Sequence, residues 1–168
     1  MKRVETRMFM RRQDIILESI EPEAFIASAS FESMTEAQLG RLAMDLGQTE
    51  SLRHFAHAMI DVYEKVTADI ARIAARRKLP MPNSLDAEHQ QFLESMREKS
   101  GRDFDLAYTD RMIDGHQSAI MLFKRGQRIK DPEISALASR TLLMLEARQR
   151  RAISLIEGIG SESQAASP

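Results

Sequence analysis

The stretch FDLAYTDRMIDGHQSAIMLF, residues 104–123, decides the fold. Its apolar residues return every three or four positions, as they do on one face of a helix, and His116 lies among them. An amphipathic helix of this kind cannot bury its apolar face alone. The rest of the chain is therefore expected to supply partner helices.

The composition favours an all-α protein. Of 168 residues, 43% are hydrophobic but only 5% aromatic, and Gly 7 and Pro 5 leave few turn formers. This length suits one domain with one core. The formal net charge is -1, with both signs interspersed, so no global field favours nucleic acid or an anionic membrane as a partner. No apolar run reaches the length of a transmembrane segment.

Two long helices are predicted before the deciding stretch. Pro22 opens the first, and Gly47 is expected to end it in a left-handed conformation. Thr49 caps the second, which runs through Arg77 until the prolines of LPMPNS, residues 79–84, stop it. The two core-facing seams are Phe25, Ser28, Glu32, Thr35, Leu39, Leu42 and Leu46, and then Leu52, Ala56, Met59, Tyr63, Val66, Ile70 and Ile73.

A short helix over about residues 86–99 precedes the deciding stretch, which ends near Gly126. Asp131, Pro132 and Glu133 then supply an N-cap, a first-position proline and a first-turn acid for the last helix. That helix is expected to end near Glu157. Its seam is Ile134, Ala138, Thr141, Leu145, Arg148, Ala152 and Leu155.

Four long helices with short connections predict an antiparallel four-helix bundle over residues 22–157. Residues 1–21 form a helical extension, and residues 158–168 a flexible tail. The extension carries an apolar stripe of Val4, Met8 and Ile15 that the four-helix core does not use. A homodimer formed through this stripe is therefore one hypothesis.

The N-terminal residues do not decide between a cytoplasmic and an exported protein. The first residues are basic, as in a signal peptide, but Arg11, Arg12 and Gln13 interrupt the apolar run that should follow. The protein is cytoplasmic if the native chain begins at Met1, or exported if a signal peptide was removed upstream. With Cys 0, a disulfide framework, a thiolate zinc site and a nucleophilic cysteine are excluded.

Several stretches resemble one bacterial family, domain of unknown function 4142. They are FIASASFESMTEAQLGRLA (25–43), FAHAMIDVYEK (55–65), LPMP (79–82), GRDFDLAYTDRMIDGHQSAIMLF (101–123) and LASRTLLMLEARQRRAISL (137–155). Phe104-Asp105, Tyr108 and His116 keep the family's spacing. The resemblance implies a ferritin-like four-helix bundle and, since members are mostly exported, a periplasmic location.

The chain departs from that family at the positions that matter for a metal. The resemblance implies a Glu in the first helix, an Asp-His pair in the second and one His in each of the last two. Glu36 and His116 match, whereas Val62 with Tyr63 replaces the pair and Arg148 replaces the last His. Two ligands are too few for a tight transition-metal site, so a degenerate metal centre is expected.

Arg148 falls on the core side of its helix, where an unpaired guanidinium is costly. One hypothesis pairs it with Glu36, with Glu32 and the Tyr63 hydroxyl close by; the alternative is that Arg148 extends to the edge of a groove and contacts nothing specific. The predicted polar core comprises Glu32, Glu36, Tyr63, Tyr108, His116 and Arg148.

Two further patterns allow a functional and a structural interpretation. His116 is either a metal ligand with Glu36 or a hydrogen-bonded core histidine. His54, His57, Asp61 and Glu64 share one face of the second helix, where they either chelate a metal or form a solvated surface. Glu32 and Glu36 resemble a pair of catalytic acids, but no nucleophile accompanies them.

The sequence thus predicts a non-enzymatic bundle that acts as an interaction or structural module, with an unidentified protein partner and no cofactor. The alternative is a metal-binding or oxidative-stress protein that holds a divalent transition metal, either at Glu36 and His116 or at the surface residues His54, His57 and Asp61.

Overall fold

The computed structural model describes the backbone of residues 20–165 and the side chains of residues 20–155. This part of the chain folds into helices and contains no strand. The helices are α2 (Pro22–Leu46), α3 (Glu50–Arg77), α4 (Ala87–Arg97), α5 (Gly101–Gly126) and α6 (Pro132–Ala165). The predicted N-terminal helix over residues 3–19 lies outside the described residues.

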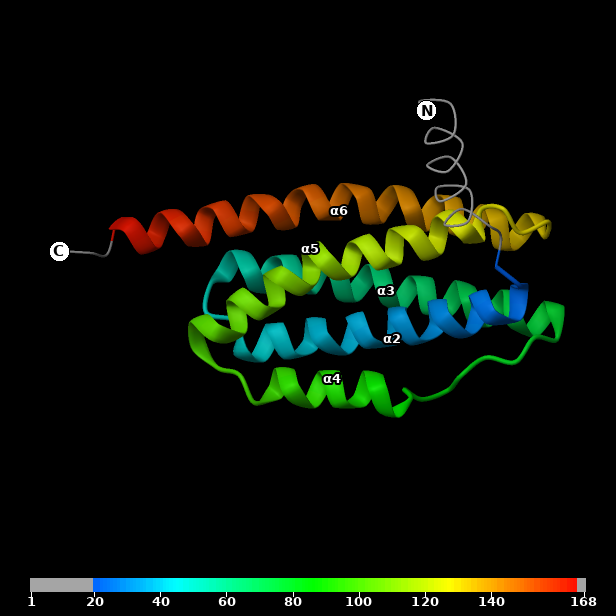
Figure 1. Ribbon diagram of the computed structural model, residues 1–168, viewed down its shortest axis with the longest axis horizontal. Helices are drawn as coiled ribbons and strands as arrows, with labels where there is room; N and C mark the ends of the chain where they lie inside the picture. The colour runs from blue at the N-terminus through cyan, green and yellow to red at the C-terminus, as the bar shows by residue number, and fades with distance from the viewer. Residues whose placement is uncertain (1–19, 166–168) are drawn as a thin grey trace, which may run out of the picture.

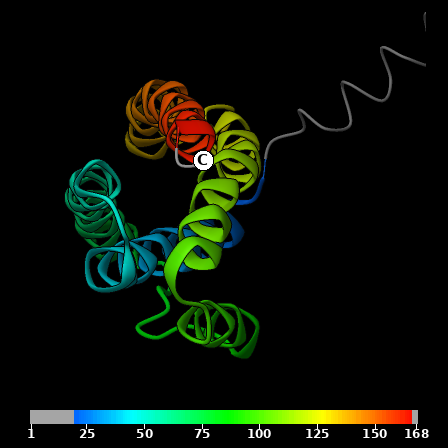
Figure 2. The ribbon, with the colours of Figure 1, turned by 90° about the vertical axis from the view of Figure 1, so that its left-hand side faces the viewer.

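The long helices α2, α3, α5 and α6 form the antiparallel four-helix bundle predicted from the sequence (Figures 1 and 2). The ring of Phe25 near the start of α2 packs edge-on against that of Phe123 near the end of α5, with centroids 5.6 Å apart. Just past the other end of α2, the Gln48 amide donates to Asp105 near the start of α5 at 3.1 Å. These two contacts fix the antiparallel register of α2 and α5.

The short helix α4 lies outside the bundle, where it packs on α2 and α5 (Figures 1 and 2). It begins one residue after its cap, Asp86, whose side chain accepts the His89 amide at 2.9 Å. Leu93 and Met96 are its buried residues. Helix α4 therefore covers the seam between α2 and α5.

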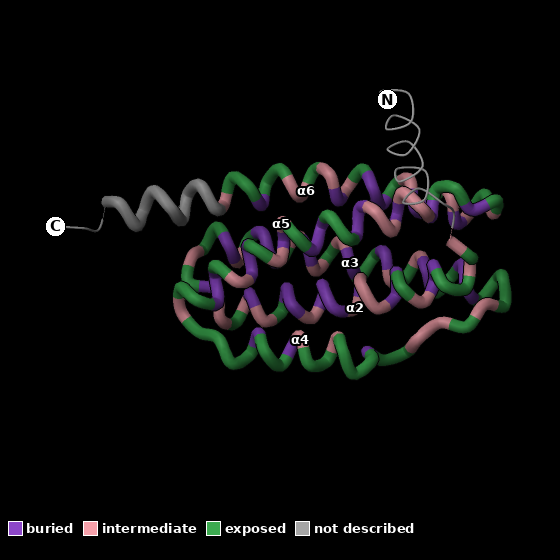
Figure 3. Tube along the Cα trace, in the orientation of Figure 1, coloured by how far each residue is buried: buried purple, intermediate pink, exposed green. Residues whose placement is uncertain are grey.

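The core follows the predicted seams most closely in α3, where all seven expected residues are buried. Figure 3 shows buried positions recurring along the long helices. In α6, Ile134, Ala138, Thr141, Leu145 and Ala152 are buried, whereas Arg148 and Leu155 are only half-buried. The apolar residues spaced three and four apart in the sequence thus identify the side of α3 and of α6 that faces the core.

The buried face of α2 is wider than its predicted seam. Ser28 is exposed, while Leu42 and Leu46 are half-buried. The reason is that α2 contacts α3, α5 and α4, so that several of its sides meet protein. Its buried residues are Phe25, Ile26, Ala29, Ser30, Ser33, Thr35, Glu36, Ala37, Leu39, Gly40 and Ala43.

Gly47 ends α2 as predicted, but not in the left-handed conformation. Its backbone is extended, with φ -62° and ψ 134°. A Cβ atom there would lie 2.5 Å from the Ala43 carbonyl oxygen and 2.6 Å from Leu52 Cδ2. Glycine is thus required because the chain turns tightly against its own helix end.

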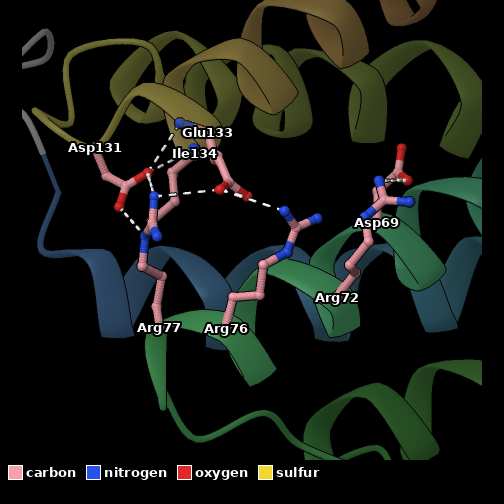
Figure 4. A network of polar contacts seen from close by, with 7 residues as sticks. All are labelled: Asp69, Arg72, Arg76, Arg77, Asp131, Glu133 and Ile134. Carbon is pink, nitrogen blue, oxygen red and sulfur yellow. Dashed lines mark hydrogen bonds and ion pairs between the residues drawn. The ribbon is translucent and has the colours of Figure 1, made fainter.

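The start of α6 is built as the sequence predicted. Asp131 accepts the amides of Glu133 at 2.9 Å and Ile134 at 3.2 Å, and Arg77 at the end of α3 forms an ion pair with the same carboxylate (Figure 4). The prediction that this helix ends near Glu157 was wrong, because the backbone is helical to Ala165. No proline interrupts the chain between Pro132 and Pro168.

Candidate functional site: a buried carboxylate and arginine cluster

A charged cluster lies between α2 and α5. Glu32 and Glu36, one turn apart on α2, face Arg111 of α5. The Arg111 guanidinium donates to Glu36 Oε1 through Nε at 2.8 Å and lies 2.6 Å from it through Nη2, while Glu32 Oε1 is 3.5 Å away. The Glu36 side chain is 2% exposed and that of Arg111 26%. The cluster is thus largely removed from solvent.

Two neighbouring residues determine where the Arg111 side chain lies. A Cβ atom at Gly115, one turn further along α5, would come within 2.8 Å of Arg111 Nε and 3.0 Å of its Cδ. The missing side chain therefore makes room for the arginine. Phe92 of α4 is in cation–π contact with the guanidinium, whose carbon is 4.8 Å from the ring centroid.

Glu32 lies closer to the surface and is also influenced by α4. Its side chain is 14% exposed. His89 of α4 stacks on Phe31 with ring centroids 5.4 Å apart, and its charge favours the ionised form of Glu32. Residues from three helices thus meet at the outer edge of the cluster.

Burial dominates the electrostatics of the two carboxyl groups. Loss of hydration raises the pKa of Glu36 to about 7, against the opposing charge of Arg111. The pKa of Glu32 is also raised by burial, against the charges of Arg111 and His89. Burial works to lower the pKa of Arg111, but the two carboxylates outweigh it and the pKa is raised. One guanidinium therefore faces two carboxyl groups, of which Glu36 gains a proton as the pH falls through about 7.

Tyr63 of α3 and Tyr108 of α5 lie within electrostatic range of the cluster. Burial, followed by the charges of Glu36 and Glu32, raises the pKa of Tyr63 well above its usual value. Burial and Glu36 likewise raise the pKa of Tyr108. Both side chains therefore stay neutral. The Tyr108 hydroxyl is buried and has no hydrogen-bond partner among the described residues.

His116 is 1% exposed and neutral. Burial, followed by the charge of Arg111, lowers its pKa to about 4, although the ring also bonds to the Met112 carbonyl. Because Nε2 has no partner among the described residues, that bond belongs to Nδ1. The Nε2 atom therefore carries a free electron pair in the interior, as a metal-binding or hydrogen-bond-accepting histidine does.

The predicted pairing of Glu36 with Arg148 is corrected by this geometry, since the partner of Glu36 is Arg111. Arg148 is half-buried on α6 and forms no ion pair with a carboxylate among the residues whose side chains are described. The core-facing periodicity of the last helix points to Arg148 and gives no indication of Arg111. The available signal was a glycine in the middle of a helix, one turn after an arginine.

The predicted surface cluster on α3 is divided into separate pairs. His54 contacts Glu50 and His57 contacts Asp61, each at 3.4 Å, while Glu64 pairs with Arg41 of α2. All of these side chains are exposed. Within the described part of the chain, no group of three or more His, Asp or Glu side chains is placed to hold a metal ion. The two interior candidates, Glu36 and His116, thus have no third ligand of these types.

The fold and the cluster define a class: an all-α antiparallel bundle with a charged pair in its interior. The chain belongs to the family described as Domain of unknown function (DUF4142), whose model matches residues 17–155. None of the described helices is long and apolar enough to cross a membrane.

One solved structure with a similar fold is the crystal structure of a DUF305 fragment from Deinococcus radiodurans. It superimposes with a TM-score of 0.69 at 13% sequence identity, covering 83% of this chain and 98% of the other. At this identity the similarity establishes the fold alone. No curated protein matches the sequence.

Proposed function

We propose that this protein is a non-enzymatic helical bundle that acts by association with other macromolecules, and that its metal centre is degenerate. The observation that carries the proposal is the position of Arg111, whose guanidinium bonds to Glu36 and lies 3.5 Å from Glu32. A fixed cation beside both carboxyl groups repels a divalent metal and already supplies the positive charge that it would bring.

The surroundings of the cluster also favour a structural role. Glu36 is closed off from solvent, so a substrate has no direct access to it. The neighbouring Tyr63 and Tyr108 are neutral, and the described part of the cluster contains no nucleophile with an adjacent base. The cluster therefore fits an internal polar contact that fixes how α2, α4 and α5 pack.

A metal analysis of untagged protein, expressed with iron, manganese and zinc and purified without chelator, tests the proposal. We expect far less than one metal per chain and no gain in melting temperature on adding these ions. One tightly held metal per chain that is lost in His116→Ala, but kept in the surface control His57→Ala, would contradict it.

A second candidate, a metal-binding or oxidative-stress function, is favoured by one observation. Glu36 Oε2 and His116 Nε2 are both buried without hydrogen-bond partners among the described residues. Such atoms are either a cost to folding or part of an incomplete site. Under this alternative, Arg111→Ala should bind the metal more tightly than the wild type, because the competing cation is gone.

A further inference from the structure

The seam between α3 and α6 is open to solvent, unlike the α2–α5 seam. Helix α4 packs on α2 and α5, and Figure 2 shows it on the side of the bundle away from α3 and α6. Two grooves lie along the open seam, one towards each of its ends. None of the described helices covers them.

The first groove lies beside the start of α6 and has a volume of about 230 Å³. Arg72 and Arg76 of α3 line one side, and Arg140 of α6 lines the other. Figure 4 shows that Arg72 turns to Asp69 and Arg76 to Glu133. Arg140 forms no ion pair with a carboxylate among residues 20–155.

The second groove lies further along α6 and has a volume of about 490 Å³. Arg151 and Leu155 line it from α6, and Ser51 and His54 from α3. Arg151 also forms no ion pair with a described carboxylate. Other exposed arginines of this protein do form such pairs, for example Arg41 with Glu64.

The two grooves share one stripe of α6. Arg140, Leu143, Ala147 and Arg151 follow one another at steps of three and four, so they lie on the same side of the helix. Leu143 is 70% exposed, the highest value among the large hydrophobic residues described. The outer surface of α6 beside the open seam therefore has an apolar centre with an arginine towards each end.

The seam carries a small excess of positive charge, concentrated at Arg140 and Arg151, although the whole chain carries a formal net charge of -1. By helical spacing, Lys65 lies on the same side of α3 as Arg72. Its cations are Lys65, Arg72, Arg76, Arg140 and Arg151, and its carboxylates are Asp69 and Glu133, with Asp61 one turn before Lys65 and Glu50 beside the groove residue His54. An acidic partner therefore gains electrostatic attraction here.

We propose that the open α3–α6 seam binds an amphipathic helix of a partner protein, with acidic residues near both ends and apolar residues between them. Arg140 and Arg151 are about 17 Å apart along the helix axis, so the partner's acids should lie about three turns apart. The apolar centre at Leu143 fits leucine or phenylalanine side chains, which the phosphate backbone of a nucleic acid does not offer. The position of α4 on α2 and α5 illustrates how a helix is seated on this bundle.

This inference rests on the proposed association function and names the surface and the partner. A fluorescein-labelled peptide of about 18 residues, with glutamates in its first and last turns and leucines at helical spacing between, serves as the probe. Its fluorescence anisotropy is measured against the full chain. We expect binding that weakens as the salt concentration rises, because exposed charges are screened.

The charge-reversing double variant Arg140→Glu/Arg151→Glu should weaken binding by about tenfold or more. It should instead bind the same peptide with lysines in place of the glutamates. The matched control Arg97→Glu/Lys99→Glu makes the same charge change at the end of α4 and in the connection after it, and should bind the acidic peptide like the wild type. Leu143→Ser should weaken binding of both peptides to their respective proteins.

Three outcomes would overturn the inference. The first is equal binding of the acidic and basic peptides to the wild type. The second is an acidic peptide that binds the double variant as well as it binds the control. The third is binding of a DNA duplex or of phosphatidylglycerol vesicles without binding of the peptide. None of these outcomes bears on the metal content, so a failure here is distinguishable from a metal centre at Glu36 and His116.

Discussion

At the residue scale, the buried ionisable groups dominate the behaviour expected of this protein. Glu36 and His116 are both almost completely buried, but their pKa values move in opposite directions. Each shift links the free energy of unfolding to pH with its own sign. The pair therefore offers a test of the interior that needs no knowledge of function.

Glu36→Gln should change how stability depends on pH. The pKa of Glu36 in the folded protein is about 7, above the ordinary value of 4.5. The protonated Glu36 therefore contributes fully to the free energy of unfolding below pH 4.5, and this contribution is lost as the pH rises towards 7. The slope is on the order of 1 kcal/mol per pH unit. Urea unfolding of wild type and variant between pH 4.5 and 8 measures it; parallel curves would contradict the assignment.

His116→Gln is the counterpart of that variant. The pKa of His116 in the folded protein is about 4, below the ordinary value of 6.5. The neutral His116 therefore contributes fully to the free energy of unfolding above pH 6.5, and this contribution is lost as the pH falls towards 4. Between pH 4.5 and 6.5 the two slopes oppose each other in the wild type. Relative to the wild type, acidification should therefore destabilise Glu36→Gln and stabilise His116→Gln.

Gly115→Ala should destabilise the protein, against the usual preference of helices for alanine. In an unconstrained helix interior this change stabilises by about 1 kcal/mol. Here the new methyl group displaces the Arg111 side chain from Glu36, at a cost of roughly 1 to 3 kcal/mol. Chemical denaturation measures the difference in the free energy of unfolding between Gly115→Ala and the wild type.

The control for this prediction is the same substitution in an Arg111→Ala background. Without the arginine side chain, the added methyl group meets no obstacle from it and the helix propensity should prevail. Gly115→Ala should then be stabilising. Equal effects in both backgrounds would show that Gly115 does not position Arg111.

At the element scale, the helix ends are defined by particular side chains. Asp131 caps α6 and also receives Arg77 from the end of α3 (Figure 4). This carboxylate therefore ties together two helices that are adjacent in space but separated in sequence. The pKa of Asp131 is lowered, first by the hydrogen bond from Arg77.

Asp131→Ala should destabilise the fold by about 1 to 2 kcal/mol, since it removes a helix cap and leaves the amides of Glu133 and Ile134 without their acceptor. Thermal unfolding measures the loss. Asp86→Ala removes the cap of the short peripheral helix α4 and should cost less. If the two variants were equally stable, the link between α3 and α6 would contribute nothing.

At the scale of the whole molecule, the bundle combines a buried polar centre with one open seam that carries a small excess of positive charge. Helix α4 covers the α2–α5 seam above Glu32 and Arg111, while Arg140, Arg151 and Leu143 lie at the surface of α6 beside the open α3–α6 seam. The net charge of -1 conceals this distribution. Association through the open seam is thus consistent with a chain that carries almost no overall charge.

The sequence by itself determined the class of fold, the family, the seams of α3 and α6 and the starts of the helices. These features are local: periodic burial depends on helical spacing, and Asp131-Pro132 or Pro22 begins a helix through its own backbone chemistry. Only the tertiary structure decided that Arg111 rather than Arg148 pairs with Glu36, because a long side chain chooses its partner by register between helices distant in sequence. It also decided which seam α4 covers and which remains open, since that depends on where the chain between α3 and α5 packs.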